Sequence, residues 1–267
     1  MLQESCWTGA LFVIGILVSS NLMLVGALLG ALTSVAGAKL LKLASEDELF
    51  RGYFGFNGAL VGIAALFFLP LSFYAVALIV GGSILSSFIM RWLSDWGRLP
   101  PYTAPFILSG WIMLFLARIF GLAENNLGVE ASLGEFAAIS RGIGQVMFQD
   151  NWLAGAIFLV GLAVCSLEAV SWAIIGSSLG LICALGLGYP ASLTFAGIFG
   201  FNASLVGIAL SNKFRNASAP LLGIILSVFI TRGFQVIDIP PLTAPFVLSS
   251  WLVIVASGFA QKPTKIL

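Results

Sequence analysis

Long apolar runs are the feature that most limits how this chain can fold. They recur along the whole sequence, and many are long enough for a helix to cross the hydrocarbon core of a bilayer. Lipid offers backbone N–H and C=O groups no hydrogen-bond partner, so each run must form a helix. The chain is 60% apolar and only 9% charged, with a mean hydropathy of +1.08. We therefore predict an all-α integral membrane protein.

The apolar runs form ten predicted spans, and one polar stretch at residues 122–150 separates five from five. The spans are placed at 6–20, 22–41, 52–69, 71–91, 103–121, 152–167, 169–187, 191–210, 218–236 and 243–261. This division predicts one membrane domain. Its parts are a first repeat at 1–121, a connector with the start of the second repeat at 122–150, and a second repeat at 151–267.

Three blocks of the first half recur, in the same order, in the second half. The pairs are 3-QESCWTGALFVIG-15 with 149-QDNWLAGAIFLVG-161, 54-FGFNGALVGIA-64 with 199-FGFNASLVGIA-209, and 100-PPYTAPFILSGW-111 with 240-PPLTAPFVLSSW-251. The offsets of 146, 145 and 140 residues drift because the loops differ in length. Each half has an odd number of spans, so the second half must enter the membrane from the opposite side. This predicts an inverted-topology repeat around a central pore.

Basic residues indicate the orientation of the ten spans. With the N-terminus inside, the cytoplasmic ends collect Lys39, Lys42, Arg51, Arg91, Arg98, Lys213, Arg215, Lys262 and Lys265. The opposite side receives Arg118, Arg141 and Arg232. Because cytoplasmic loops carry an excess of Lys and Arg, we expect both termini in the cytoplasm and every basic residue at a span end.

Prolines interrupt the fifth span at Pro100, Pro101 and Pro105. Freed backbone groups are tolerated at membrane depth only inside protein or beside a cavity, which predicts a functional break. The residue before a proline avoids helical angles, so we expect Ala104 to be extended, with the hydroxyl of Thr103 beside the break. The second half offers the same set in Pro240, Pro241, Thr243 and Pro245. The alternative is that these prolines only kink lipid-facing helices.

The doubled Gly-Phe-Asn sequence marks a second interruption in each half. Gly55 and Gly200 permit unusual backbone angles, and we expect the buried amides of Asn57 and Asn202 to need hydrogen-bond partners.

Two phenylalanines within these blocks, Phe56 and Phe201, lie next to the predicted openings. A pair of aromatic faces there would form slots through which a planar solute passes by stacking. The chain holds 22 phenylalanines, so the alternative is that both belong to the ordinary core or face lipid.

A third candidate lies in 144-GQVMFQDN-151, ahead of the sixth span. The amide oxygen of Gln145 accepts hydrogen bonds from N–H donors, and Phe148 lies one turn later if the stretch is helical. The alternative is an ordinary polar helix start with Asn151 as its cap.

Charged and metal-binding side chains are scarce, which limits the possible functions. The chain has no histidine, its three cysteines (Cys6, Cys165 and Cys183) are far apart, and Glu168, the single acid within a long apolar stretch, falls at a turn. We expect no metal, no cofactor, no catalytic site and no nucleic-acid partner. Hydroxyls, amides, carbonyls and aromatic faces instead suit a small, neutral, planar solute that moves passively.

The doubled P-P-x-T-A-P-F and G-F-N-x-x-L-V-G-I-A blocks resemble the signature blocks of the urea transporter family over almost the whole chain. The resemblance implies two inverted five-span repeats, each with a tilted half-helix, and a continuous pore through each protomer of a homotrimer in the plasma or inner membrane. It implies that urea moves down its concentration gradient between phenylalanine slots. Its amide groups would donate hydrogen bonds to a file of carbonyl and side-chain oxygens.

The resemblance also implies a role for each matching residue. It makes Phe56 and Phe201 the slots, backed by Leu60 and Leu205, and Thr103 and Thr243 the constriction. It makes Gln145 the oxygen-bearing residue ahead of the second repeat, followed by Val146 and Phe148.

The first half departs from the family pattern at its start. Gln3 aligns with Gln149 and Leu2 with Phe148, so a partner for Gln145 would fall before Met1. Either the start site is placed too late, or one pocket lacks its side-chain acceptor and its phenylalanine.

Two alternatives to a urea channel stay open. One is a channel for other small neutral solutes, such as short amides, ammonia or water, which the residues alone do not distinguish from urea. The other is a membrane-embedded enzyme or sensor, which the scarcity of buried acids and the absence of histidine disfavour.

Overall fold

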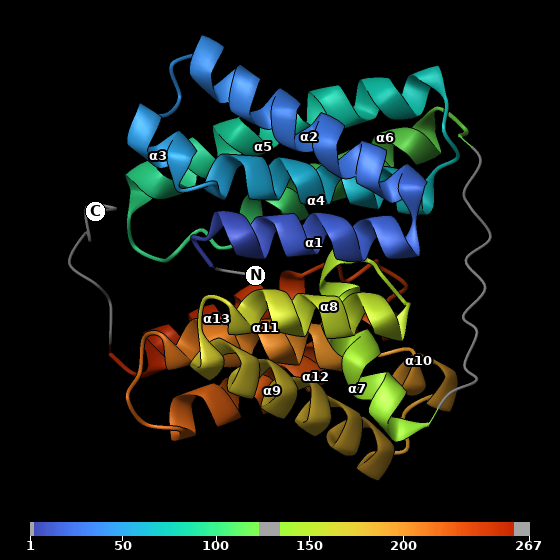
Figure 1. Cartoon of the computed structure of the whole chain (residues 1–267), viewed down its shortest axis with the longest axis vertical. Coiled ribbons are helices and arrows are strands. Elements are labelled where there is room, and N and C mark those ends of the chain that lie inside the picture. Colours follow the sequence, from blue (N-terminus) through green and yellow to red (C-terminus); the bar gives the residue numbers. More distant parts are fainter. Residues whose placement is uncertain (1–2, 123–133, 259–267) are drawn as a thin grey trace. The chain divides into compact units, whose positions relative to one another are not determined.

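The computed structural model describes residues 3–122 and 134–258, with the side chains of residues 135 and 136 left aside. The end of the last predicted span at 259–261, and Lys262 and Lys265, lie outside the described residues. The described chain is helical throughout, with no strand, as the apolar runs predict (Figure 1). Its helices form two compact units, one holding α2 to α6 and the other holding α1 and α7 to α13.

The unit built from the first half of the chain contains five helices. They are α2 (Asn21–Leu40), α3 (Glu46–Phe50), α4 (Tyr53–Phe68), α5 (Phe73–Trp96) and α6 (Ala104–Ile119). Serine side chains start two of the long helices, because the Ser20 hydroxyl accepts from the N–H of Met23 and the Ser72 hydroxyl accepts from the N–H of Ala75.

Glycines bring α2 and α4 of this unit together. A Cβ atom added at Gly26 or Gly30 of α2 would collide with the backbone carbonyls of Gly62 or Gly58 of α4. Two helices approach this closely only where side chains are absent, so these glycines allow the two backbones to pack directly.

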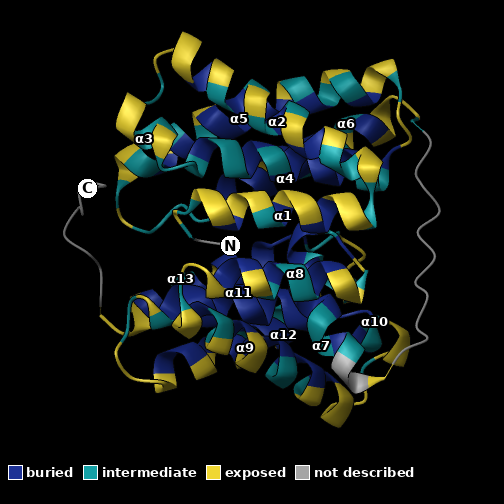
Figure 2. Cartoon of the chain, viewed as in Figure 1, coloured by how far each residue is buried: buried dark blue, intermediate teal, exposed yellow. Residues whose placement is uncertain are grey.

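The second unit contains the remaining helices. They are α1 (Cys6–Ser19), α7 (Glu135–Gly144), the 3₁₀ helix η1 (Gln145–Met147), α8 (Trp152–Ala163), α9 (Leu167–Gly186), α10 (Ala191–Phe195), α11 (Gly200–Ser211), α12 (Ser218–Val236) and α13 (Ala244–Ala256). The helix α11 is buried from Gly200 to Leu210, so it forms the centre of this unit (Figure 2).

The helix α1 packs against α8, which carries the matching block of the second half. The Thr8 hydroxyl donates to the carbonyl of Gly161 at 2.8 Å. The rings of Phe12 and Phe158 pack with centroids 4.7 Å apart. The first predicted span therefore joins the unit built from the second half, while the division into repeats stays a prediction.

Helix lengths alternate in the same order in both halves. Within the described residues, four helices are long and apolar enough to cross a membrane, namely α2, α5, α9 and α12. The shorter apolar helices are α1, α4, α6, α11 and α13, while α7 with η1 and α8 form a pair bent by 75°. A helix of 16 residues reaches only about 24 Å, so the short helices do not span the roughly 30 Å hydrocarbon core by themselves.

The prediction of one continuous span at 191–210 is wrong. Residues 196–199 separate α10 from α11, and Gly197 adopts a left-handed φ of +83°. A Cβ atom there would also collide with the backbone of Gly142 in α7. This close crossing, which is formed by residues distant in sequence, divides the apolar run.

Candidate functional site

The proline-rich segment after α5 leads directly into α6. The N–H of Ala104 donates to the carbonyl of Pro101 at 2.9 Å, and the N–H of Ile107 donates to that of Thr103 at 3.0 Å. The expectation that Ala104 is extended is therefore wrong, because Ala104 opens α6. Pro105 lies in the first turn of α6, where backbone N–H groups have no intrahelical acceptor. The lack of an N–H in proline therefore removes no helix hydrogen bond there.

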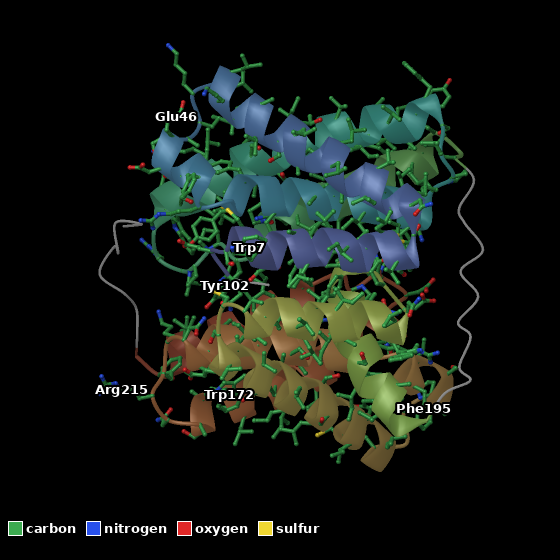
Figure 3. All side chains as sticks on the ribbon, viewed as in Figure 1. Trp7, Glu46, Tyr102, Trp172, Phe195 and Arg215 are labelled. Carbon is green, nitrogen blue, oxygen red and sulfur yellow. The ribbon has the colours of Figure 1, made fainter. Side chains whose placement is uncertain are left out.

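The side chain of Asn57 in α4 holds this break in place. Its Oδ1 accepts from the N–H of Phe106 at 3.0 Å, and its Nδ2 donates to the carbonyls of Tyr102 at 3.3 Å and Tyr53 at 3.0 Å. Tyr102, labelled in Figure 3, has a φ of +45°, an unfavourable angle for a residue with a side chain. Such strain persists where surrounding contacts determine it, and Asn57 supplies those contacts.

The second half repeats the arrangement with its own residues. Asn202 of α11 accepts from the N–H of Phe246 at 3.1 Å and donates to the carbonyl of Leu242 at 3.4 Å. Leu242 has a φ of +46°, and the N–H of Ala244 donates to the carbonyl of Pro241 at 2.9 Å. The expectation that both asparagine amides need buried partners is thus met by the same backbone groups in each half.

Both threonines of the proline blocks precede the first residue of a helix. Thr103 and Thr243 are each 1% exposed and are the N-cap residues of α6 and α13, but neither hydroxyl caps its helix. Pro100 and Pro101 precede α6 and Pro240 and Pro241 precede α13, whereas Pro105 and Pro245 lie in the first turns of these helices. Each helix therefore begins with a buried hydroxyl beside the break.

The phenylalanines of the Gly-Phe-Asn blocks lie in the first turns of α4 and α11. Phe56 is half-buried and Phe201 is buried, and Leu60 and Leu205 follow four residues later on the same helix faces. Each pair lies next to the asparagine that holds the break of its own unit.

Neither Gly55 nor Gly200 adopts the unusual backbone angles that a glycine permits. The left-handed glycines lie three residues earlier, at Gly52 with a φ of +81° and at Gly197. Gly55 belongs to α4 and Gly200 opens α11. A Cβ atom at Gly200 would instead crowd the Ser177 hydroxyl, so this glycine permits a close approach.

The Gln145 amide is anchored to the end of α10. Its Nε2 donates to the carbonyl of Ala196 at 3.3 Å, which directs the amide oxygen away from that carbonyl and keeps it an acceptor. Val146 is fully buried, and the helical turn ends at Phe148, which has a left-handed φ of +58°. The side chain of Asn151 caps α8 by accepting from the N–H of Leu153 at 2.9 Å. The alternative prediction, a polar helix start with Asn151 as its cap, is therefore also correct.

The acid Glu168 and the base Arg141 differ in their exposure to solvent. Glu168 is exposed in the first turn of α9, as its turn position predicts. Arg141, expected at a span end, is buried in the last turn of α7, one turn before Gln145. The four-residue spacing in 141-RGIGQ-145 is the sequence signal that links the two.

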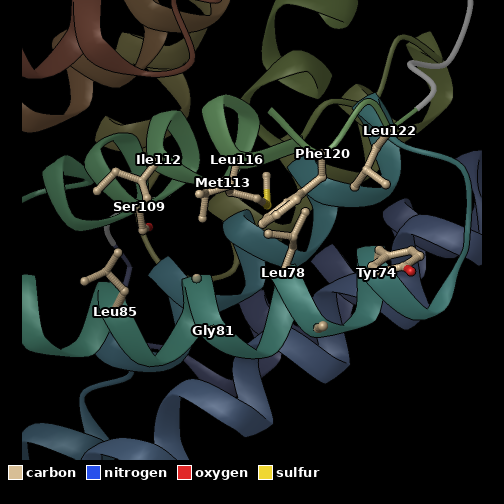
Figure 4. A pocket seen from close by; sticks show the side chains of 12 residues that line it. Tyr74, Leu78, Gly81, Leu85, Ser109, Ile112, Met113, Leu116, Phe120 and Leu122 are labelled. Atoms are coloured by element: carbon tan, nitrogen blue, oxygen red, sulfur yellow. The ribbon is translucent and has the colours of Figure 1, made fainter. Parts of the chain in front are cut away.

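A groove of about 410 Å³ lies between α5 and α6, away from the residues predicted for the site (Figure 4). Its lining is almost wholly apolar, with Leu78, Met113 and Phe120 among its residues. The hydroxyl of Ser109, which also lines it, already donates to the carbonyl of Pro105 at 2.7 Å. The groove therefore suits hydrocarbon rather than a polar solute.

Comparison with known proteins gives the family. A family model described as "Urea transporter" matches residues 1–258. A protein named urea transporter 1 from Ovis aries is 28% identical over 274 residues, which cover 92% of this chain and 71% of the relative. Its counterpart from Capra hircus is 27% identical over 276 residues, and the one from Rattus norvegicus is 28% identical over 280, with the same coverage. The chain is a multi-pass membrane protein and belongs to the urea transporter family.

Proposed function

We propose that this protein conducts urea passively across the membrane, down its concentration gradient. The observation that carries the proposal is the pair of breaks held by Asn57 and Asn202 through matching backbone groups. Freed backbone beside two buried threonines provides polar groups at membrane depth without any charge.

The chemistry of these groups fits urea. Urea presents four N–H donors and one carbonyl in a plane, so it needs acceptors along its path and flat walls. The hydroxyls of Thr103 and Thr243 and the amide oxygen of Gln145 are such acceptors. Phe56 and Phe201, backed by Leu60 and Leu205, supply aromatic faces for stacking. No covalent step is needed, so we assign no enzyme activity, cofactor or metal.

The proposed architecture is a pair of inverted repeats around the pore. Support comes from α1 and α8, whose matching residues contact each other reciprocally. The Phe158 ring covers Gly15 while the Phe12 ring covers Gly161, and each pair is related by the offset of 146 residues. Across a two-fold axis, residue i of the first half contacts residue j of the second half, and residue j of the first half contacts residue i of the second. The contacts of Phe12 with Gly161 and of Phe158 with Gly15 follow this pattern.

The remaining parts of the proposal rest on the family and on charge. They are a homotrimer in the plasma or inner membrane, with both termini in the cytoplasm. The excess of basic residues assigned to one side supports the orientation. Light scattering of the purified protein in detergent tests the trimer, because a monomer there would contradict it.

A solute series in reconstituted liposomes tests the proposed function. Stopped-flow light scattering would compare urea with acetamide, formamide, glycerol and water, using protein-free liposomes as the control. We expect urea to permeate faster than the other solutes. Equal rates for urea and the other amides would favour the channel for general small neutral solutes, and no protein-dependent flux would contradict transport.

A further inference from the structure

Arg141 places a charge in the interior of the described chain. It is 7% exposed, and it is the one charged side chain that is buried among the described residues. Its Nη1 donates to the carbonyl of Phe195 at 3.5 Å, whereas its Nε has no hydrogen-bond partner. The ion pairs of the described chain involve other residues, so no carboxylate neutralises this guanidinium there.

Helix ends partly compensate the charge without removing it. Arg141 lies in the last turn of α7, and Phe195, labelled in Figure 3, is the last residue of α10. Carbonyl groups at a helix C-terminus carry partial negative charge and favour a nearby cation. Neutral dipoles hold the guanidinium in place, but they leave its unit positive charge and the field around it.

The charge lies one helical turn from a residue of the proposed path. Arg141 and Gln145 are four residues apart and donate to the consecutive carbonyls of Phe195 and Ala196. Residues at this spacing lie on one face of a helix, about 6 Å apart. A solute that donates to the Gln145 oxygen therefore comes close to the guanidinium.

The other residues of the proposed path do not reject cations. Phenylalanine faces attract cations, and hydroxyl or amide oxygens accept from any N–H donor. Guanidinium is a planar cation with nearly the size and shape of urea, so the shape of the slots and the acceptors do not distinguish it from urea. A positive charge beside the path adds a repulsion that the other path residues lack, a device that other membrane channels use against cations.

We propose, on the basis of the proposed function, that Arg141 is the specificity residue that excludes guanidinium and other planar cations from the urea path. Urea is neutral and does not experience the repulsion. The charge acts through its field at the Gln145 position and not through contact with the solute.

The test compares guanidinium flux with urea flux in the same liposomes. We expect wild-type protein to pass urea and to exclude guanidinium. In Arg141→Gln, which keeps an N–H donor but removes the charge, the guanidinium-to-urea ratio should rise about tenfold or more, the order expected for unit charges within about 10 Å. Arg141→Lys, which keeps the charge, should exclude guanidinium as the wild type does.

A control and a second variant make the outcome decisive. Arg215→Gln removes a charge from an exposed position of the same unit, and its flux ratio should stay unchanged (Figure 3). Should Arg141→Gln fail to fold, Gln145→Glu places a carboxylate one turn from Arg141 and should raise the same ratio.

The outcomes separate this inference from the function on which it rests. Wild-type protein that passes guanidinium as fast as urea overturns the role of Arg141 and leaves urea transport intact. An unchanged ratio in a folded Arg141→Gln, or in Gln145→Glu when the first variant does not fold, also overturns it. Absence of urea flux in the wild type contradicts the proposed function itself.

Discussion

Phe12 and Phe158 pack on each other with ring centroids 4.7 Å apart. The Phe12 ring also lies over Gly161, and the Phe158 ring lies over Gly15. The two phenylalanines and the two glycines, Gly15 and Gly161, occupy matching positions of the sequence repeat. The contact between α1 and α8 thus depends on two small residues at equivalent places.

Filling either glycine position should therefore destabilise the protein. Gly15→Leu or Gly161→Leu forces a buried ring to move, and overpacking of this kind costs about 1–3 kcal/mol. The unfolding temperature in detergent measures the effect. Gly9→Leu in the same helix is the matched control, because a Cβ atom there meets nothing within 4 Å. Equal unfolding temperatures for Gly9→Leu and Gly15→Leu would contradict the packing argument.

Removing an asparagine that holds a break should impair both stability and transport. Asn57→Ala removes this partner from the N–H of Phe106 and the carbonyl of Tyr102, and loss of a hydrogen-bond partner costs about 1–3 kcal/mol for a buried group. We expect a lower unfolding temperature and urea flux reduced by about tenfold or more. Asn202→Ala should behave alike, whereas Asn212→Ala, at an exposed position, should change neither quantity. Normal flux in Asn57→Ala would show that the break needs no such anchor.

Replacing the constriction threonines should slow urea without changing the shape of the path. Thr103→Val or Thr243→Val removes a hydroxyl, and an unpaired N–H of the solute costs roughly 1–3 kcal/mol. Urea flux should fall by about one to two orders of magnitude while the protein stays folded. Thr103→Ser, which restores the hydroxyl, should recover most of the flux. Unchanged flux in the double valine variant would remove both residues from the path.

Shortening the slot phenylalanines should relax selectivity for planar solutes. Phe56→Ala and Phe201→Ala widen the proposed slots, so glycerol flux should rise relative to urea flux. Phe115→Ala is the control, because that ring is 63% exposed on α6. Should both slot variants still reject glycerol, Phe56 and Phe201 belong to the ordinary core.

Transport should depend on neither membrane potential nor an ion gradient. The proposed path residues are neutral, and Glu168 is exposed at the start of α9, so Glu168→Gln should leave urea flux unchanged. Moving one charge across the membrane involves about 2.3 kcal/mol per 100 mV, and a coupled cycle would therefore respond strongly. Urea should reach equal concentrations on both sides at any imposed potential. Accumulation driven by a sodium or proton gradient would point to Glu168 as a coupling residue.

Local sequence was sufficient for the class of the protein and the approximate positions of its helices. Apolar runs and helix formation in lipid both depend on neighbouring residues, which is why α2 and α12 agree with their predicted spans to within a residue. The doubled blocks likewise identified Asn57 and Asn202 as buried amides in need of partners.

Contacts between distant residues decided the rest, and no local pattern contains them. The partner of Asn57 is the N–H of Phe106, 49 residues away, and this bond helps to place Ala104 in a helix although the following proline disfavours it. The division of 191–210 follows from Gly197 meeting the backbone of α7, and the burial of Arg141 follows from α10 packing beside it. Hydrophobicity sets which segments enter the membrane, whereas close packing and long-range hydrogen bonds determine where each helix breaks and which charge is enclosed.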